Sequence, residues 1–172
     1  CAVGLANEKI DPSELQIGVI MIGDTSDLGF NYSHLVGLQE MQKNLGLKDS
    51  QIIRKNSIAD DDVTATDRAI RECIEEGCNI IFADSFGHED FMIQAAKEFK
   101  DVQFCHATGT KAHTEGLSNY HNAFASIYEG RYLAGVAAGM KLNEMIDYRL
   151  MSNEILMNAY PDAVSYTHLR AH

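Results

Sequence analysis

Short apolar runs alternate along the chain with longer segments whose apolar residues recur at helical spacing. The apolar runs cover 16–22 (QIGVIMI), 52–53, 79–83 (NIIFA) and 102–105. The helical segments cover 30–45, 63–76 and 89–99, and the first two are followed by the stop residues Gly46 and Gly77. This alternation predicts an α/β fold with a doubly wound parallel sheet, because parallel strands need crossover connections.

Two details of this pattern make sharper predictions. The run 79–83 lacks polar alternation, so we expect its strand to be buried on both faces of the sheet. Three consecutive carboxylates at 60–62 precede the second helix, where they suit the positive end of its dipole and are expected to cap it.

The carboxyl ends of the predicted strands mark where a ligand is expected, because doubly wound sheets bind ligands beyond that edge. Three loops lie there, at 24–30, 84–88 and 106–110. The last of these loops has small side chains at Ala107 and Gly109, which would let a ligand approach the backbone.

The first loop combines short acceptors with aromatic rings. Asp24, Ser26 and Asp27 precede Phe30 and Tyr32. This arrangement suits a flat ligand with polar edges, since stacking of a base on an aromatic ring is worth roughly 1–3 kcal/mol. A structural alternative is that Asp27 caps the following helix while Phe30 packs into the core.

The loop after the third strand offers a second set of contacts. Ser85 can donate a hydrogen bond to a ligand, and Phe86 can form a second aromatic wall. The alternative is again structural, with Asp84 or Ser85 capping the next helix.

Charge and motifs exclude several classes of function. The net charge is −11, from 25 acidic and 14 basic residues, which disfavours nucleic acid as a partner. The first loop contains neither a dinucleotide-binding nor a phosphate-binding glycine motif. No histidine spacing predicts a metal site, and no nucleophile–base arrangement can be proposed. We therefore expect no catalytic residues, no metal and no cofactor, and a binding protein rather than an enzyme.

One signalling alternative uses the same topology. A receiver domain would need acidic residues after the first and third strands, and Asp24, Asp84, Thr108 and Lys111 stand at comparable positions. The adjacent acidic pair usual after the first strand is absent, because Gly23 precedes Asp24.

The four cysteines form no CxxC pair. Cys73 and Cys105 fall on apolar stretches and are expected to be small buried side chains. Cys1 is the first residue of the sequence and is followed by a polar segment. This arrangement favours a lipidated cysteine that anchors the protein to the outer face of a bacterial cell membrane, and the alternative is an arbitrary truncation point.

Four segments together resemble a known family. These segments are GDTSDLGFNYSHLVGL, IIFADSFGHED, VQFCHATGTK and SIYEGRYLAGVAAG, between about Ile17 and Met145. They resemble the basic membrane protein family of solute-binding lipoproteins, which serve ABC importers. The resemblance implies a type I periplasmic binding protein fold in which two lobes close on a nucleoside, typically a purine.

The resemblance also implies particular roles for residues and partners. Asp27 and Asn31 would be polar ligand contacts, and Phe30 would stack on the base. Ser85 and Phe86 would supply the contact after the third strand. An ABC permease would receive the ligand; a ligand-sensing periplasmic module that reports to a membrane signalling partner is the alternative.

The same resemblance predicts the organisation of the chain. We expect a lipoprotein tether at 1–15, the N-terminal ligand-binding lobe at 16–124, and the first helix of a second lobe at 125–145. Residues 146–172 match no expected element and are interpreted as an anomalous, spurious tail.

Overall fold

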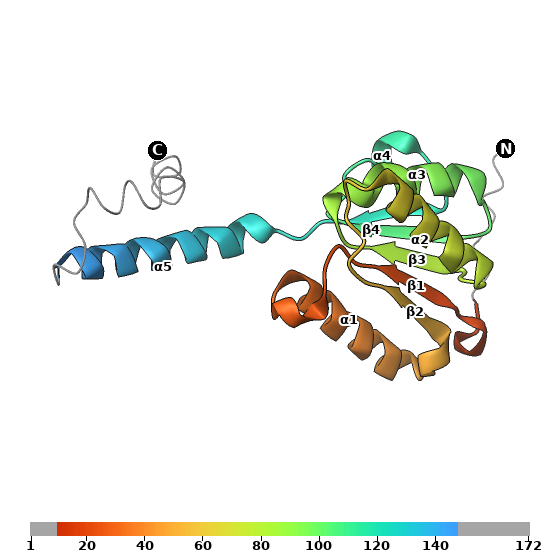
Figure 1. Cartoon of the computed structure of the whole chain (residues 1–172), viewed down its shortest axis with the longest axis horizontal. Helices are drawn as coiled ribbons and strands as arrows, with labels where there is room; N and C mark the ends of the chain where they lie inside the picture. Colours follow the sequence, from red (N-terminus) through yellow and green to blue (C-terminus); the bar gives the residue numbers. More distant parts are fainter. Residues whose placement is uncertain (1–9, 148–172) are drawn as a thin grey trace. The chain divides into compact units, whose positions relative to one another are not determined.

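The computed structural model describes residues 10–147 of the 172. Five parallel strands form one sheet in the order β2-β1-β3-β4-β5 (Figure 1). The strands are β1 (Ile17–Ile20), β2 (Ile52–Lys55), β3 (Ile80–Ala83), β4 (Gln103–Ala107) and β5 (Tyr120–Ala123). The helices are α1 (Phe30–Leu45), α2 (Val63–Glu75), α3 (Glu89–Glu98), α4 (Ala112–Glu115) and α5 (Ile127–Asp147). Four short 3-10 helices are η1 (Pro12–Glu14), η2 (Thr25–Asp27), η3 (Asp49–Gln51) and η4 (Phe86–His88).

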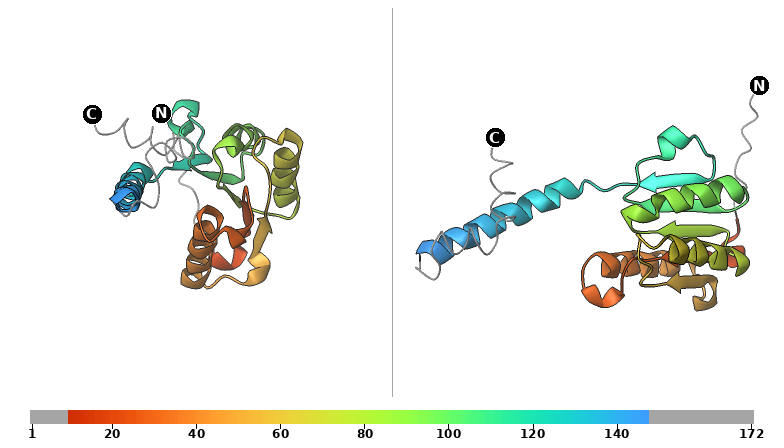
Figure 2. Two further views of the ribbon diagram at one scale, coloured as in Figure 1. Left: turned by 60° about the vertical axis from the view of Figure 1, so that its left-hand side comes forward. Right: turned by 45° about the horizontal axis from the view of Figure 1, so that its top comes forward.

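The order of the strands confirms the predicted doubly wound topology. The chain moves from β1 outward to β2, then returns past β1 to β3, β4 and β5. Because the crossovers are right-handed, this reversal puts α1 on one face of the sheet and α2 and α3 on the other (Figures 1 and 2).

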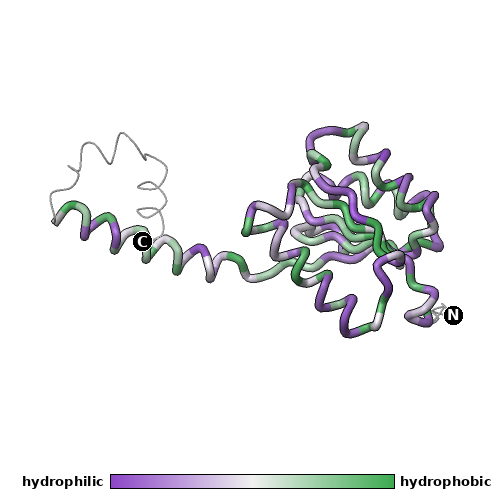
Figure 3. The backbone as a smooth tube through the Cα atoms, turned by 60° about the horizontal axis from the view of Figure 1, so that its bottom comes forward, coloured by the Kyte–Doolittle hydropathy of each residue, from purple (hydrophilic) through white to green (hydrophobic). Residues whose placement is uncertain are grey.

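Each face of the sheet carries its own hydrophobic cluster. The larger cluster joins the sheet to α2 and α3, and includes Ile20, Ile70, Met92 and Phe104. The smaller one joins β1 to α1 through residues such as Leu38. Figure 3 shows the hydrophobic backbone segments gathered along the strands, with the hydrophilic segments mainly in the flanking helices and loops.

Three details differ from the sequence predictions. β3 is only partly buried at Ile80 and Phe82, because α1 alone of the described helices in residues 10–124 covers that face. β4 continues through His106 and Ala107, so the following loop begins at Thr108. α4 has no counterpart among the predicted elements, whereas β5 lies where the N-terminal lobe was expected to end, near residue 124.

The described residues divide into two units, 10–124 and 125–147. In the second unit, α5 leaves large apolar side chains exposed, among them Leu133 at 68% and Met140 at 69%. Cys1 and most of the expected tether and tail lie outside the described residues. Within residues 10–147, no helix is both long enough and apolar enough to cross a membrane.

Candidate functional site

The loops at the carboxyl edge of the sheet contain unusual backbone conformations. Among the described residues, the non-glycine residues with positive φ are Leu28 (48°), Ser57 (57°) and Thr108 (71°). They lie in the loops that follow β1, β2 and β4, at the same edge of the sheet. A β-branched residue such as Thr108 rarely adopts this conformation, and such strain clusters at functional sites.

Asp27 organises the start of α1. One carboxylate oxygen accepts from the backbone N–H groups of Gly29 and Tyr32, both at 3.0 Å. The other accepts from the Asn31 backbone N–H at 2.8 Å and from its side-chain amide at 2.9 Å. These hydrogen bonds, the one from Gly29 foremost, hold the pKa of Asp27 well below its usual range. The capping alternative for Asp27 is therefore confirmed.

Asn31 connects this cap to the end of β1. Its side-chain oxygen accepts from the Gly23 backbone N–H at 3.0 Å, and only 7% of Asn31 is exposed. A Cβ on Gly23 would lie 2.6 Å from the Asn31 amide nitrogen, so this close approach requires glycine. Asp27 and Asn31, both expected to contact ligand, are thus bonded to each other and shape the loop from within.

Phe30 occupies the first position of α1 and is 42% exposed. The alternative in which Phe30 packs into the core is therefore wrong. Its ring meets the His34 ring edge-on, with centroids 4.7 Å apart and an interplanar angle of 73°. This contact orients Phe30 and still leaves ring surface open for stacking.

Ser85 and Phe86 are placed differently from each other. The Ser85 hydroxyl donates to Asp60 at 2.5 Å, and the same Asp60 oxygen accepts from the Gly87 backbone N–H at 3.0 Å. These bonds lower the pKa of Asp60 and tie the loop after β2 to the loop after β3. Phe86 is 65% exposed. Ser85 makes no side-chain cap, so that alternative is wrong for Ser85.

The three carboxylates at 60–62 do not share one role. Asp62 caps α2 as predicted, accepting from the Ala65 backbone N–H at 2.9 Å. Asp60 instead turns toward the site loops, and sequence spacing gives no signal of this.

At the carboxyl edge of the sheet, Asp84 was not predicted from the sequence to be a ligand-binding residue. It is 97% buried, and one carboxylate oxygen accepts from the Ile22 backbone N–H at 2.9 Å. The other oxygen has no hydrogen-bond partner within the described residues. Burial raises the pKa of this carboxyl group, only partly offset by the Ile22 bond.

Asp84 faces a cavity of about 410 Å³. Ser33, His34 and Gly37 of α1 form one side, while Phe82 and Ala107 belong to the sheet. The lining of the cavity is mostly apolar and includes a few polar groups, which is typical of small-molecule sites. A buried acceptor without a partner is costly unless a ligand or water satisfies it.

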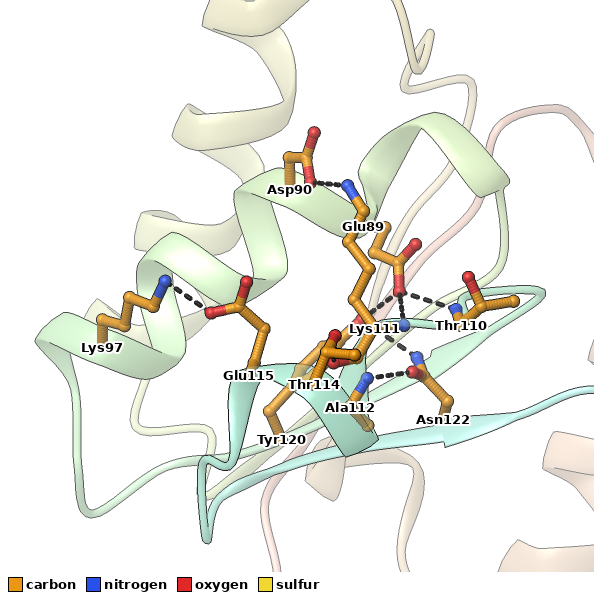
Figure 4. A network of polar contacts seen from close by, with 10 residues as sticks. All are labelled: Glu89, Asp90, Lys97, Thr110, Lys111, Ala112, Thr114, Glu115, Tyr120 and Asn122. Carbon is orange, nitrogen blue, oxygen red and sulfur yellow. Dashed lines mark hydrogen bonds and ion pairs between the residues drawn. The ribbon is translucent and has the colours of Figure 1, made fainter.

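A network behind the site holds the loop after β4 (Figure 4). One Glu89 oxygen accepts from the backbone N–H groups of Thr110 at 2.7 Å and Lys111 at 2.8 Å, and from the Tyr120 hydroxyl at 3.1 Å. Asn122 donates to the Tyr120 hydroxyl at 3.0 Å and accepts from the Ala112 backbone at 2.7 Å.

Gly109 is enclosed by this network. A Cβ there would lie 2.3 Å from His106 Nδ1, 2.5 Å from Asn122 Nδ2 and 2.6 Å from a Glu89 carboxylate oxygen. The small side chain predicted to admit a ligand is therefore required by packing inside the protein.

The receiver alternative does not fit this geometry. Lys111 pairs with Asp90, and Asp24 bonds the Ser26 backbone N–H at 2.8 Å. Both groups thus have local partners away from Asp84. Among the described residues, no three histidine, cysteine or acidic side chains are placed to bind a metal ion.

Comparison with known proteins identifies the family. Residues 14–169 match the family of ABC transporter substrate-binding proteins described as PnrA-like. The chain belongs to this family. The expectation of a binding protein rather than an enzyme is thereby confirmed, as is the resemblance to ABC solute-binding proteins.

Individual relatives agree at the level of the family. A purine-binding protein of Brucella abortus (strain 2308) is 37% identical over 125 residues, which cover 73% of this chain and 34% of that protein. An ABC transporter protein of Haloferax volcanii, named for glucose binding, is 29% identical over 121 residues, covering 70% and 29%. The chain thus spans about a third of the length of these relatives.

A solved structure supports the fold. The ABC transporter solute-binding protein of Conexibacter woesei matches with a TM-score of 0.54 at 20% identity. The match covers 64% of this chain and 35% of that one. The five-stranded parallel sheet is therefore one lobe of the periplasmic-binding-protein type.

Proposed function

We propose that the full-length protein is the receptor of an ABC importer and binds a purine nucleoside or base between two lobes. The lobe described here supplies one wall of that cleft. Family membership favours transport over a sensory role. The 37% identical purine-binding relative supports purines as the first ligand class to test.

The observation that carries the proposal is the presentation of Phe30. Asp27 accepts from the backbone N–H groups on either side of Phe30, and His34 contacts the Phe30 ring, while Phe30 stays 42% exposed at the carboxyl edge of the sheet. Exposed aromatic surface on a rigid support suits stacking on a flat heterocycle. Phe86, 65% exposed after β3, offers a second ring at the same edge.

Asp84 supplies the polar complement. Asp84 lines a mostly apolar cavity, and its second carboxylate oxygen is buried without a partner among the described residues, so a ligand N–H or hydroxyl group that reaches this oxygen would satisfy a buried acceptor. In this proposal Asp27, Asn31 and Ser85 contribute first by shaping the loops, through the bonds they make to the chain.

The test is calorimetric titration of the full-length protein with purine nucleosides, purine bases and glucose. We expect micromolar or tighter binding of at least one purine, and Phe30→Ala should weaken it roughly 5- to 150-fold, the range that corresponds to 1–3 kcal/mol of stacking. Leu45→Ala is the matched control, because Leu45 ends the same helix and is 43% exposed.

Two outcomes would contradict the proposal. Binding of glucose without any purine would reassign the ligand class. Equal weakening by Phe30→Ala and Leu45→Ala would remove Phe30 from the site.

A further inference from the structure

The end of α2 brings two cysteines together, far from the candidate site. The Cys78 backbone N–H donates to the Cys73 carbonyl at 2.9 Å, and the Gly77 N–H donates to the Ile74 carbonyl at 3.0 Å. Gly77 has a φ of +85°. This pair of bonds around a left-handed glycine is a Schellman motif, which commonly brings the side chains of the residues equivalent to Cys73 and Cys78 into contact.

The two sulfur atoms meet above Gly18 of β1. A Cβ on Gly18 would lie 3.0 Å from Cys73 Sγ and 3.3 Å from Cys78 Sγ. Both sulfur atoms therefore occupy the space that the missing side chain leaves open. The residues are 0% and 2% exposed, and both are free thiols in this structure. A hydrogen bond from Cys73 to Cys78, together with burial, raises the pKa of the Cys73 thiol.

We propose that Cys73 and Cys78 form an intramolecular disulfide when the protein folds in an oxidising compartment. The family consists of transport binding proteins that work outside the cytoplasm, where disulfides form and persist. The Schellman motif already holds the two backbones in contact, as a disulfide requires. Gly18, against which both sulfur atoms lie, has no side chain to crowd them.

The oxidant is a small-molecule or protein disulfide, such as oxidised glutathione. The Cys78 thiolate attacks one sulfur of the oxidant, which forms a mixed disulfide and releases one thiol. The Cys73 thiolate then attacks Cys78 Sγ and displaces the second thiol. The protein loses two protons and two electrons, and the oxidant is reduced to two thiols.

The two cysteines lie at the opposite edge of the sheet from the candidate ligand site. Cys78 directly precedes Asn79, whose backbone N–H donates to the Gln16 carbonyl before β1 begins. The pair therefore lies at the amino edge of the sheet, opposite the loops of the candidate site. Oxidation is expected to leave ligand affinity unchanged.

The test compares full-length protein exported to a bacterial periplasm with the same protein refolded in reducing buffer and in excess oxidised glutathione. Each sample is denatured, alkylated and cut after glutamate. Glu75 and Glu76 lie between the cysteines, so cleavage leaves Cys73 and Cys78 on separate peptides that stay joined only by a disulfide. We expect joined peptides in the exported and oxidised samples alone, and a melting temperature a few degrees higher there.

Variants make the result decisive. Cys73→Ser and Cys78→Ser should each abolish the joined peptides and the redox dependence of the melting temperature, whereas Cys105→Ser should change neither. Alkylated, unjoined Cys73 and Cys78 in both the exported and the glutathione-refolded protein would overturn the proposal. The two cysteines would then be packing residues only.

Discussion

At the scale of single residues, Asp84 is a buried carboxyl group whose hydrogen-bonding capacity is satisfied only in part by the described residues. Asp84→Asn removes the cost of burying a charge and keeps an oxygen for the Ile22 N–H. We expect this variant to raise the free energy of unfolding at pH 7.5 and to weaken purine binding, because one acceptor becomes a donor. Stability and affinity would then move in opposite directions, as is common at binding sites.

The pH dependence of Asp84→Asn follows from the raised pKa of Asp84. A carboxyl group with a raised folded-state pKa binds its proton more tightly when folded, so its stabilising contribution is lost as pH rises through that pKa. The advantage of the variant should therefore vanish near pH 3 and grow above the ordinary carboxyl pKa. Denaturant unfolding at several pH values measures this, with the exposed Asp101→Asn as control. A pH-independent difference would contradict the argument.

The sequence predicted the roles of residues that act on their immediate neighbours in the chain. It did not predict the roles of residues whose contacts come from distant parts of the sequence. A carboxylate just before a helix predicted the cap at Asp62, and it made a cap at Asp27 the structural alternative to ligand contact. The bond between Asp60 and Ser85 joins residues from loops after different strands, so no local pattern reveals it. The free oxygen of Asp84 depends on burial by several elements at once.

At the scale of elements, α1 depends on Asp27 for its first turn. Asp27→Ala would leave the N–H groups of Asn31 and Tyr32 without this acceptor, and would remove an anion from the positive end of the helix. We expect a lower melting temperature and weaker purine binding, since the turn carries Phe30. Asp24→Ala should have a smaller effect, because Asp24 bonds only the local N–H of Ser26. Equal effects of the two variants would argue against a special role for Asp27.

The loop after β4 depends on the absence of a side chain at Gly109. Gly109→Ala would force a Cβ to within 2.6 Å of three side-chain atoms, and overpacking of this kind costs about 1–3 kcal/mol. Gly37→Ala on α1 is the control and should raise the free energy of unfolding. No atom lies within 4 Å of a Cβ added at Gly37, and alanine favours a helix over glycine by about 1 kcal/mol. Chemical denaturation of both variants checks this, and a neutral Gly109→Ala would show that the network can rearrange.

The regular elements were predictable where hydrophobic periodicity was clear. The strands β1 and β3 are apolar runs, and α1 ends at the glycine that the pattern indicated. β5 has the sequence YHNA and pairs on one side only, so its stability comes from β4 and from Tyr120, not from an apolar run. β4 was predicted to end at Cys105 because His106 is polar. In the structure His106 belongs to β4 and is only 1% exposed.

At the scale of the whole molecule, the chain corresponds to one lobe of the longer binding proteins to which it is similar. It covers about a third of the length of its relatives, and the groups proposed to contact the ligand are gathered at a single edge of one sheet. A ligand held only at that edge would keep much of its surface in water. A second lobe closing over it would exclude water and strengthen each polar contact.

Lobe closure predicts a change in shape on binding. In the full-length protein, we expect the radius of gyration measured by small-angle X-ray scattering to fall when the purine identified by calorimetry is added, because the ligand favours the closed state by its differential affinity. Phe30→Ala should require correspondingly more ligand for the same change, whereas Leu45→Ala should behave as the native protein. A constant radius despite calorimetric binding would leave the ligand assignment standing and rule out closure as the mechanism.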